Sequence, residues 1–359
     1  MKKLLNDFLD RYFHDEESII LLVLLIFGLA VLLVLGGVLA PLITAIIIAY
    51  LMQGLVNLLL KYGLSARLAF VLVYTVFIGV FLLLLLFLLP EAWNQLRRLI
   101  NELPSLISQW QSSLLSLPGN YPNLFSEQQI RDFIVVVRGE LGGYGQTVLE
   151  YSLASIPSVI GWFIFIILVP ILVFFVMKDQ EKLVAWAGNF LPRNRPLMRR
   201  IWLEMDQQIA NYIRGKVVEI FIVGGVSFLI FEVLGINYGL LLSVLVGLSV
   251  VVPYLGATVV TIPIAAVAFV QWGIGADFYT VLIAYGILQL IDGNVLVPVI
   301  FSEAVNLHPV AIIAAVLVFG GIWGLAGVFF AIPLATLIKA IINAWPGTVH
   351  GKFNDKNSG

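Results

Sequence analysis

The chain of 359 residues has no cysteine, only three histidines, and few charged residues, which make up 11% of the sequence. Without cysteine there is no disulfide, thiol nucleophile, iron–sulfur cluster or cysteine zinc site. Soluble domains carry about 25% charged residues, whereas 61% of this chain is hydrophobic. The composition therefore excludes an ordinary water-soluble protein, and no metal or cofactor is expected.

Charge of one sign is missing from a long part of the chain. Residues 217–338 contain no lysine or arginine and only five acidic residues: Glu219, Glu232, Asp277, Asp292 and Glu303. Over the whole chain 20 basic residues nearly balance 21 acidic ones, for a net charge of -1. This balance offers no basic surface for nucleic acid.

Long hydrophobic runs predict membrane-spanning helices. No charged residue occurs from Ser18 to Leu60, and one span needs about 20 apolar residues. Two spans are expected there, with a hinge at Gly36-Gly37 ahead of Pro41. A third span is expected from Ala66 to Leu89, ended by Pro90, and a fourth near 156–176.

The distribution of basic residues predicts the orientation of these spans. Residues 178–216 carry eight Lys or Arg residues, so the positive-inside tendency makes this segment cytoplasmic and, counting back, the N-terminus as well. Five further apolar runs follow, near 217–234, 239–252, 257–271, 278–300 and 309–345. The C-terminal lysines then lie inside only if residues 239–271 form one broken span or a re-entrant hairpin.

We therefore predict an all-α polytopic membrane protein with about eight transmembrane helices and both termini cytoplasmic. The expected divisions are a cytoplasmic interfacial N-terminus (1–17), transmembrane helices 1–3 (18–90), an extracytoplasmic helical insert (91–153), transmembrane helix 4 (154–177), a cytoplasmic basic amphipathic helix (178–216), a C-terminal transport core (217–345) and a cytoplasmic tail (346–359).

The insert at 91–153 is predicted to be helical because its apolar residues recur every three or four positions. A first amphipathic helix begins near Trp93, and Pro104 should kink it or mark a restart. Ser126 and Gln129 resemble a capping box that begins a second helix, which continues to about Leu141. Such helices could pack on each other, on neighbouring subunits or on lipid headgroups.

A charged side chain at bilayer depth costs about 2.5–3.5 kcal/mol on insertion scales, so it needs a partner or a wet cavity. Asp292 lies deep in an apolar run, beside Gly293 and Asn294 and close to Gln289. Loosened helices at this depth are usual substrate sites of transporters. We predict that these four residues line a solute or ion pathway; the alternative is a polar clamp between helices.

A second candidate site is Pro253, Tyr254 and Gly256, where backbone carbonyls could be free to meet a ligand. A plain turn at the membrane surface explains the same residues.

Three further charged residues are weaker candidates for the pathway. Glu219 can pair with Lys216 one helical turn away, at the interface. Glu232 has no basic residue in reach on its own helix, so it is either a coupling-ion site or an exposed helix end. Arg214 is the fixed positive charge closest to this half of the chain.

Catalytic motifs are missing from the sequence. No Ser–His or His–His pairing occurs at a useful spacing in any span, and no Gly-rich turn is followed by the lysine of a phosphate loop. An enzyme is therefore not expected. His308, directly before Pro309, is expected to cap a helix, and Gly320 with Gly324 permits close helix contact or a hinge.

Several segments taken in order resemble the autoinducer-2 exporter family of bacterial inner-membrane permeases. The matching segments are Pro41 through Ala49-Tyr50-Leu51; Pro170 with Phe174-Phe175 and Lys178-Asp179; Tyr212-Ile213-Arg214-Gly215; Gly235-Ile236-Asn237-Tyr238; Pro253-Tyr254-Leu255-Gly256; Asp292-Gly293-Asn294 with Pro298; Leu307-His308-Pro309; and Gly320-Gly321 through Gly324, Gly327 and Ala331-Ile332-Pro333. Together they extend from the second expected span to the last.

The resemblance implies seven or eight spans and an oligomeric carrier, a pentamer, that exports a small polar signal such as autoinducer-2. Other members of the family are assigned to sodium or proton antiport. The leading hypothesis is thus a secondary transporter in the bacterial inner membrane. The runner-up is a Na⁺(Li⁺)/H⁺ antiporter that uses Asp292, Glu232 or Glu219, and a third hypothesis is an oligomeric membrane scaffold whose amphipathic insert binds partners.

Overall fold

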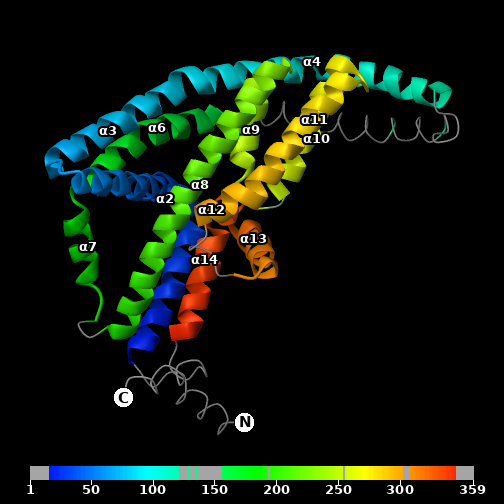
Figure 1. The fold of residues 1–359 in the computed structure, drawn as a ribbon. Helices are drawn as coiled ribbons and strands as arrows, with labels where there is room; N and C mark the ends of the chain where they lie inside the picture. The colour runs from blue at the N-terminus through cyan, green and yellow to red at the C-terminus, as the bar shows by residue number, and fades with distance from the viewer. Residues whose placement is uncertain are drawn as a thin grey trace, which may run out of the picture.

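The computed structural model describes residues 16–120, 128, 135, 156–192, 195–253, 255–301 and 307–344, and all regular secondary structure in these residues is helical (Figure 1). Five of the helices are long and apolar enough to cross a membrane, or six if a pair bent by 77° counts as one span. These helices confirm the all-α multi-pass membrane class. The count of eight spans is not confirmed.

Helix α2 (Glu16–Lys61) contains the region expected to divide into two spans. It is one helix of 46 residues with Pro41 inside it, so the prediction of two separate spans is wrong. In an apolar environment a broken helix would leave backbone amides and carbonyls without partners, and glycine or proline therefore bends such a helix more readily than it ends it. Figure 1 shows α2 changing direction along its length.

The third expected span does not end at Pro90. Helix α3 (Ala66–Leu83), the π-helical turn η1 (Leu84–Leu88) and helix α4 (Leu89–Asn120) follow one another without a gap. Proline lacks an N–H group, and its ring clashes with the carbonyl four residues earlier. The wider π turn directly before Pro90 accommodates both defects, so the helix continues.

Helix α4 confirms a long amphipathic helix in the first part of the insert, and it passes residue 104 without a break. The second expected helix lies mostly outside the described residues; residues 128 and 135 are helical.

Helix α6 (Ile156–Lys178) matches the fourth expected span, and α7 (Gln180–Gly188) is the helix bent by 77° relative to it. Helix α8 (Pro196–Leu234) runs from the basic segment directly into the fifth span, as the sequence predicts. Its first turn lies beside the start of α2, because the Met198 amide donates to a carboxylate oxygen of Glu17 at 2.7 Å.

Residues 239–271 form a hairpin and not one broken span. Helix α9 (Gly239–Ser249) is followed by a short tip and by α10 (Leu255–Trp272). The two open ends of the hairpin meet, since the Asn237 amide donates to Gln271 Oε1 at 2.7 Å and Gln271 Nε2 donates to the Gly235 carbonyl at 2.7 Å. The chain therefore enters and leaves this region at the same end of the molecule.

The remaining helices complete the second half of the chain. Helix α11 (Ala276–Ile291) passes through a second π turn, η2 (Asp292–Leu296), into the short helix α12 (Val297–Phe301). Helices α13 (Pro309–Trp323) and α14 (Leu325–Ala344) form another hairpin, turned at Gly324 with φ 61°. Figure 1 shows α12 beside the middle of α8, α14 running along the lower half of α8, and α13 next to α14.

The largest apolar core joins α8, α9, α10 and α11. Its fully buried side chains include Phe231, Leu242, Ile264 and Val281, one from each of these helices. A second core packs α2 and α3 against α6 around Ala45, Ala69 and Val173.

Candidate functional site

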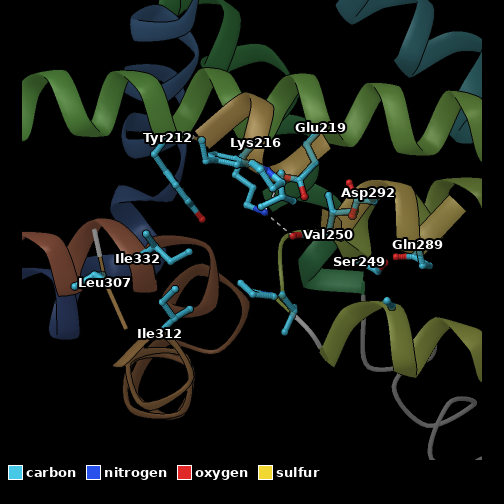
Figure 2. Close-up of a pocket in the computed structure, with 17 residues that line it drawn as sticks. Tyr212, Lys216, Glu219, Ser249, Val250, Gln289, Asp292, Leu307, Ile312 and Ile332 are labelled. Carbon is cyan, nitrogen blue, oxygen red and sulfur yellow. Dashed lines mark hydrogen bonds and ion pairs between the residues drawn. The ribbon is translucent and has the colours of Figure 1, made fainter. Parts of the chain in front are cut away.

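A cavity of about 500 Å³ lies where α8, the α9–α10 tip, η2, α12, α13 and α14 converge (Figure 2). Its wall is apolar except for a few side chains that carry charge or hydrogen-bonding groups. The lining residues are Tyr212, Lys216, Glu219, Ser249, Val250, Val252, Pro253, Ala257, Gln289, Asp292, Gly293, Val297, Pro298, Phe301, Leu307, Ile312 and Ile332.

A buried ion pair on α8 forms one side of the cavity. Lys216 Nζ lies 2.8 Å from Glu219 Oε2, and the two side chains are 6% and 2% exposed. The sequence predicts this pair and places it at the membrane interface; its depth in the membrane stays a prediction. The structure confirms the pair and shows that both side chains are buried, because α8 presents one face to the packed helices of the C-terminal half.

Asp292 faces the same cavity from η2. The residue is 8% exposed, and its Oδ1 atom has no hydrogen-bond partner among the described residues. Figure 2 shows Asp292 beside Glu219 and Lys216, and the charges of all three act on one another. Gln289, one turn earlier, also carries a buried amide nitrogen, Nε2, that has no hydrogen-bond partner in the described part of the chain. The cavity thus presents one unused acceptor and one unused donor.

A proline accounts for the local shape of the helix at Asp292. Pro298 lies two residues after η2, as Pro90 lies two residues after η1. The same steric cause therefore produces both π turns. In the second case the wide turn begins at a carboxylate that faces the cavity.

The predicted residues divide into those that line the cavity and those that do not. Gln289, Asp292, Gly293, Glu219 and Pro253 line it.

Asn294 and Gly256 lie elsewhere. Asn294 is exposed, and its Nδ2 donates to the Leu290 carbonyl of its own helix at 2.9 Å. Gly256 is buried against backbone, since a Cβ at this position would lie 1.8 Å from the Ser249 carbonyl oxygen. Tyr254 is outside the described residues.

Glu232 and Arg214 also lie away from the cavity wall. Glu232 is exposed at the C-terminal end of α8. The Arg214 guanidinium packs against Gly54 of α2, where a Cβ would lie 2.6 Å from Nε. Whether either residue takes part in transport stays a prediction.

Sequence reasoning missed Lys216 and Tyr212 as residues of the site. Besides its bond to Glu219, Lys216 Nζ donates to the Val250 carbonyl at 2.8 Å and lies 5.2 Å from the centroid of the Phe301 ring. The Tyr212 hydroxyl donates to the Phe329 carbonyl at 2.9 Å. One signal was present: Lys216 is the last basic residue before the 217–338 stretch that has none.

The predicted cap at His308 is confirmed, since its Nδ1 atom accepts from the Val310 amide at 3.3 Å at the start of α13. Of the glycines predicted to pack, Gly320 lies close to Val328, whereas Gly324 forms the turn itself.

Helix α4 contacts the open end of the α9–α10 hairpin. Gln95 Oε1 accepts from the Leu241 amide at 2.9 Å, in the first turn of α9. The Tyr238 hydroxyl donates to the Glu102 carboxylate. Burial and this carboxylate raise the pKa of Tyr238 to about 12. The amphipathic helix of the insert therefore fixes the hairpin that forms part of the cavity wall.

Comparison with known proteins identifies the family. The model of the AI-2E family transporter matches residues 22–347. The chain belongs to the AI-2E transporter family. It is 46% identical over 346 residues to "Putative permease PerM" of Escherichia coli K12, an alignment that covers 96% of this chain and 98% of that protein.

More distant relatives come from Bacillus subtilis. "Putative transport protein YrrI" is 26% identical over 311 residues, which cover 86% of this chain and 87% of that protein. "Putative transport protein YueF" is 26% identical over 307 residues, covering 84% and 82%. Membership of this permease family indicates a role in membrane transport and agrees with the absence of catalytic motifs from the sequence. Within the described residues no group of three or more His, Asp or Glu side chains could hold a metal ion.

Proposed function

We propose that this AI-2E family member is a secondary transporter that carries a small polar solute through the cavity between α8, the α9–α10 tip and η2. The supporting observation is the buried Oδ1 atom of Asp292, which has no hydrogen-bond partner among the described residues, in a cavity of about 500 Å³ at an interrupted helix. Cavities of roughly 300–1,000 Å³ suit small ligands. Ionisable residues inside a membrane protein usually serve a pathway.

The charges that line the cavity favour a neutral or cationic solute. Lys216 contributes one positive charge, and Glu219 and Asp292 contribute two negative ones, which leaves a formal charge of -1 when all three are ionised. Gln289 Nε2 can donate and Asp292 Oδ1 can accept a hydrogen bond, and neither atom has a partner among the described residues. A solute with neighbouring hydroxyl groups, such as autoinducer-2, satisfies both, and we propose its export across the bacterial inner membrane.

The test is uptake of autoinducer-2 by everted membrane vesicles that contain the protein. Asp292→Asn should raise the KM for uptake about tenfold or more, because a hydrogen bond to a charged group contributes about 1.5–3 kcal/mol. Asp277→Asn is a matched control on the exposed first turn of α11, away from the cavity. Equal uptake by the wild type and Asp292→Asn would refute the site, and no uptake above empty vesicles would refute this substrate.

A second candidate function is exchange of Na⁺ or Li⁺ for protons. The observation that favours it is the same Asp292 oxygen, which could bind either a proton or a cation. Addition of sodium or lithium to energised vesicles should then change the signal of a pH dye, and Asp292→Asn should abolish the change. A silent dye between about pH 6 and 9 would remove this alternative.

We also propose that the chain assembles as a homo-oligomer, a pentamer by family resemblance, with both termini cytoplasmic. The starts of α2 and α8 and the end of α14 lie at one end of the molecule, where Leu21, Ile201 and Ala340 pack together. Native mass spectrometry of detergent-extracted protein measures the number of subunits, and a reporter fused to the C-terminus measures its side.

A further inference from the structure

The tip of the α9–α10 hairpin carries backbone carbonyls that its own helix cannot satisfy. Helix α9 ends at Ser249, and the last carbonyls of a helix have no partner within it. One of the carbonyls at this end, that of Val250, accepts a hydrogen bond from Lys216 Nζ at 2.8 Å. A cation at the C-terminal end of a helix is also favoured by the helix dipole.

Lys216 joins three elements around the cavity. It belongs to α8, it bonds the hairpin tip, and its ammonium group lies 5.2 Å from the ring centroid of Phe301 on α12. Glu219 holds the ammonium group from the same helix at 2.8 Å. Among the residues that the structure describes, no other basic residue lines the cavity. Its charge therefore has no substitute among the lining residues.

The other side of the tip makes apolar contacts. Val252 packs against the cluster of Ala315, Val316 and Ala331 on α13 and α14. The base of the tip also packs on α8, since Val250 shares a buried apolar cluster with Val223, and a Cβ on Gly247 would lie 3.1 Å from the Gly224 Cα. Apolar contacts are not directional. The bond from Lys216 to Val250 adds a directional contact between α8 and the tip backbone.

We propose that Lys216 is a positioning residue that holds the α9–α10 tip against α8 and so keeps this wall of the cavity closed. Glu219 aims the ammonium group at the Val250 carbonyl and balances its charge. The consequence for solute movement rests on the function proposed above, but the position of the tip does not. Loss of the ammonium group should therefore open the tip even where no solute is carried.

The natural absence of cysteine permits a direct measurement of the tip. Ser249→Cys places a single thiol next to Val250, at a residue that lines the cavity and is 9% exposed. The rate of its reaction with N-ethylmaleimide reports how often the tip opens. Adding Lys216→Met should raise this rate about tenfold or more, and adding Lys216→Arg should restore a slow rate, because a guanidinium group can bond both the carbonyl and the carboxylate.

Controls separate opening of the tip from unfolding. Arg200→Met removes an exposed basic residue of the same helix and should leave the rate unchanged. If Lys216→Met alone does not fold, the double variant Lys216→Met with Glu219→Gln removes the bond to Val250 without leaving a buried carboxylate uncompensated. Fast labelling of a monodisperse sample of this double variant is again expected. Unchanged labelling of either folded variant overturns the proposal.

Transport measured on the same preparations distinguishes the two proposals. Fast labelling of the Lys216→Met protein without uptake of autoinducer-2 by the wild type supports the positioning role of Lys216 and refutes the proposed substrate. Solute uptake by the wild type, together with unchanged labelling of the Lys216→Met protein, refutes only the positioning role of Lys216.

Discussion

Replacing Lys216 by methionine should destabilise the protein strongly, because it leaves Glu219 buried without its partner. Both side chains are nearly inaccessible, at 6% and 2% exposure. Breaking a buried pair on one side typically costs about 3–5 kcal/mol. With an unfolding entropy of about 2.1 cal/mol/K per residue, a chain of 359 residues should melt roughly 4–7 °C lower.

The intrinsic fluorescence of the protein, which has 8 tryptophans, measures this change during heating of detergent-solubilised samples. The double variant Lys216→Met with Glu219→Leu should recover most of the lost stability, since an apolar pair of similar size often replaces a buried ion pair without loss. The two single variants and the double variant then form a cycle that gives the coupling between the side chains.

The chain contains a matched control at its surface. Lys182 and Asp179 have the same three-residue spacing and a similar distance, 2.9 Å, but the Lys182 side chain is 84% exposed. Water screens such a pair, so Lys182→Met should leave the melting temperature nearly unchanged. Equal shifts for Lys182→Met and Lys216→Met, or no shift for Lys216→Met, would refute the argument from burial.

Two further predictions concern the hairpin. Gly256→Ala should lower stability by at least about 1–3 kcal/mol, because its Cβ would lie 1.8 Å from the Ser249 carbonyl oxygen. Gly286→Ala should not destabilise the protein, because a Cβ there has nothing within 4 Å. Equal melting temperatures of the two variants would contradict this prediction. Because the pKa of Tyr238 is raised from 10.0 to about 12, the folded state holds this proton more tightly than the unfolded state, so stability should fall as pH rises from 10 to 12. Tyr238→Phe should remove part of that fall in thermal melts, and an unchanged pH profile would contradict the assigned bond to Glu102.

The sequence predicted the helices whose signal is local. Apolar runs and helical periodicity located α6, α8 and the amphipathic α4, since these patterns depend on residues within a few turns of one another. The cap at His308 was predictable for the same reason. Glycine and proline were the main source of error: a hinge was expected at Gly36-Gly37, ahead of Pro41, and an end at Pro90, but the helices continue through both places. In an apolar environment the backbone stays helical because it has no other hydrogen-bond partner.

The site was predictable only in part. Asp292 and Gln289 stand out because polar groups are rare in apolar runs, and both line the cavity. Asn294 has the same sequence signal but lies on the exposed side of its helix. Which side faces the cavity depends on the wide turn at η2 and on the packing of α11 against other helices. Neither is visible in residue spacing.

By itself the sequence determined that this is a helical membrane protein whose second half holds isolated acids, since composition and hydropathy follow directly from residue type. Only the tertiary structure decided that residues 239–271 turn back as a hairpin and that Lys216 bonds its tip. Residues 216 and 250 are 34 positions apart, and their contact depends on how α8, α9 and α10 pack. That arrangement follows from side-chain fit between helices, which no local pattern encodes.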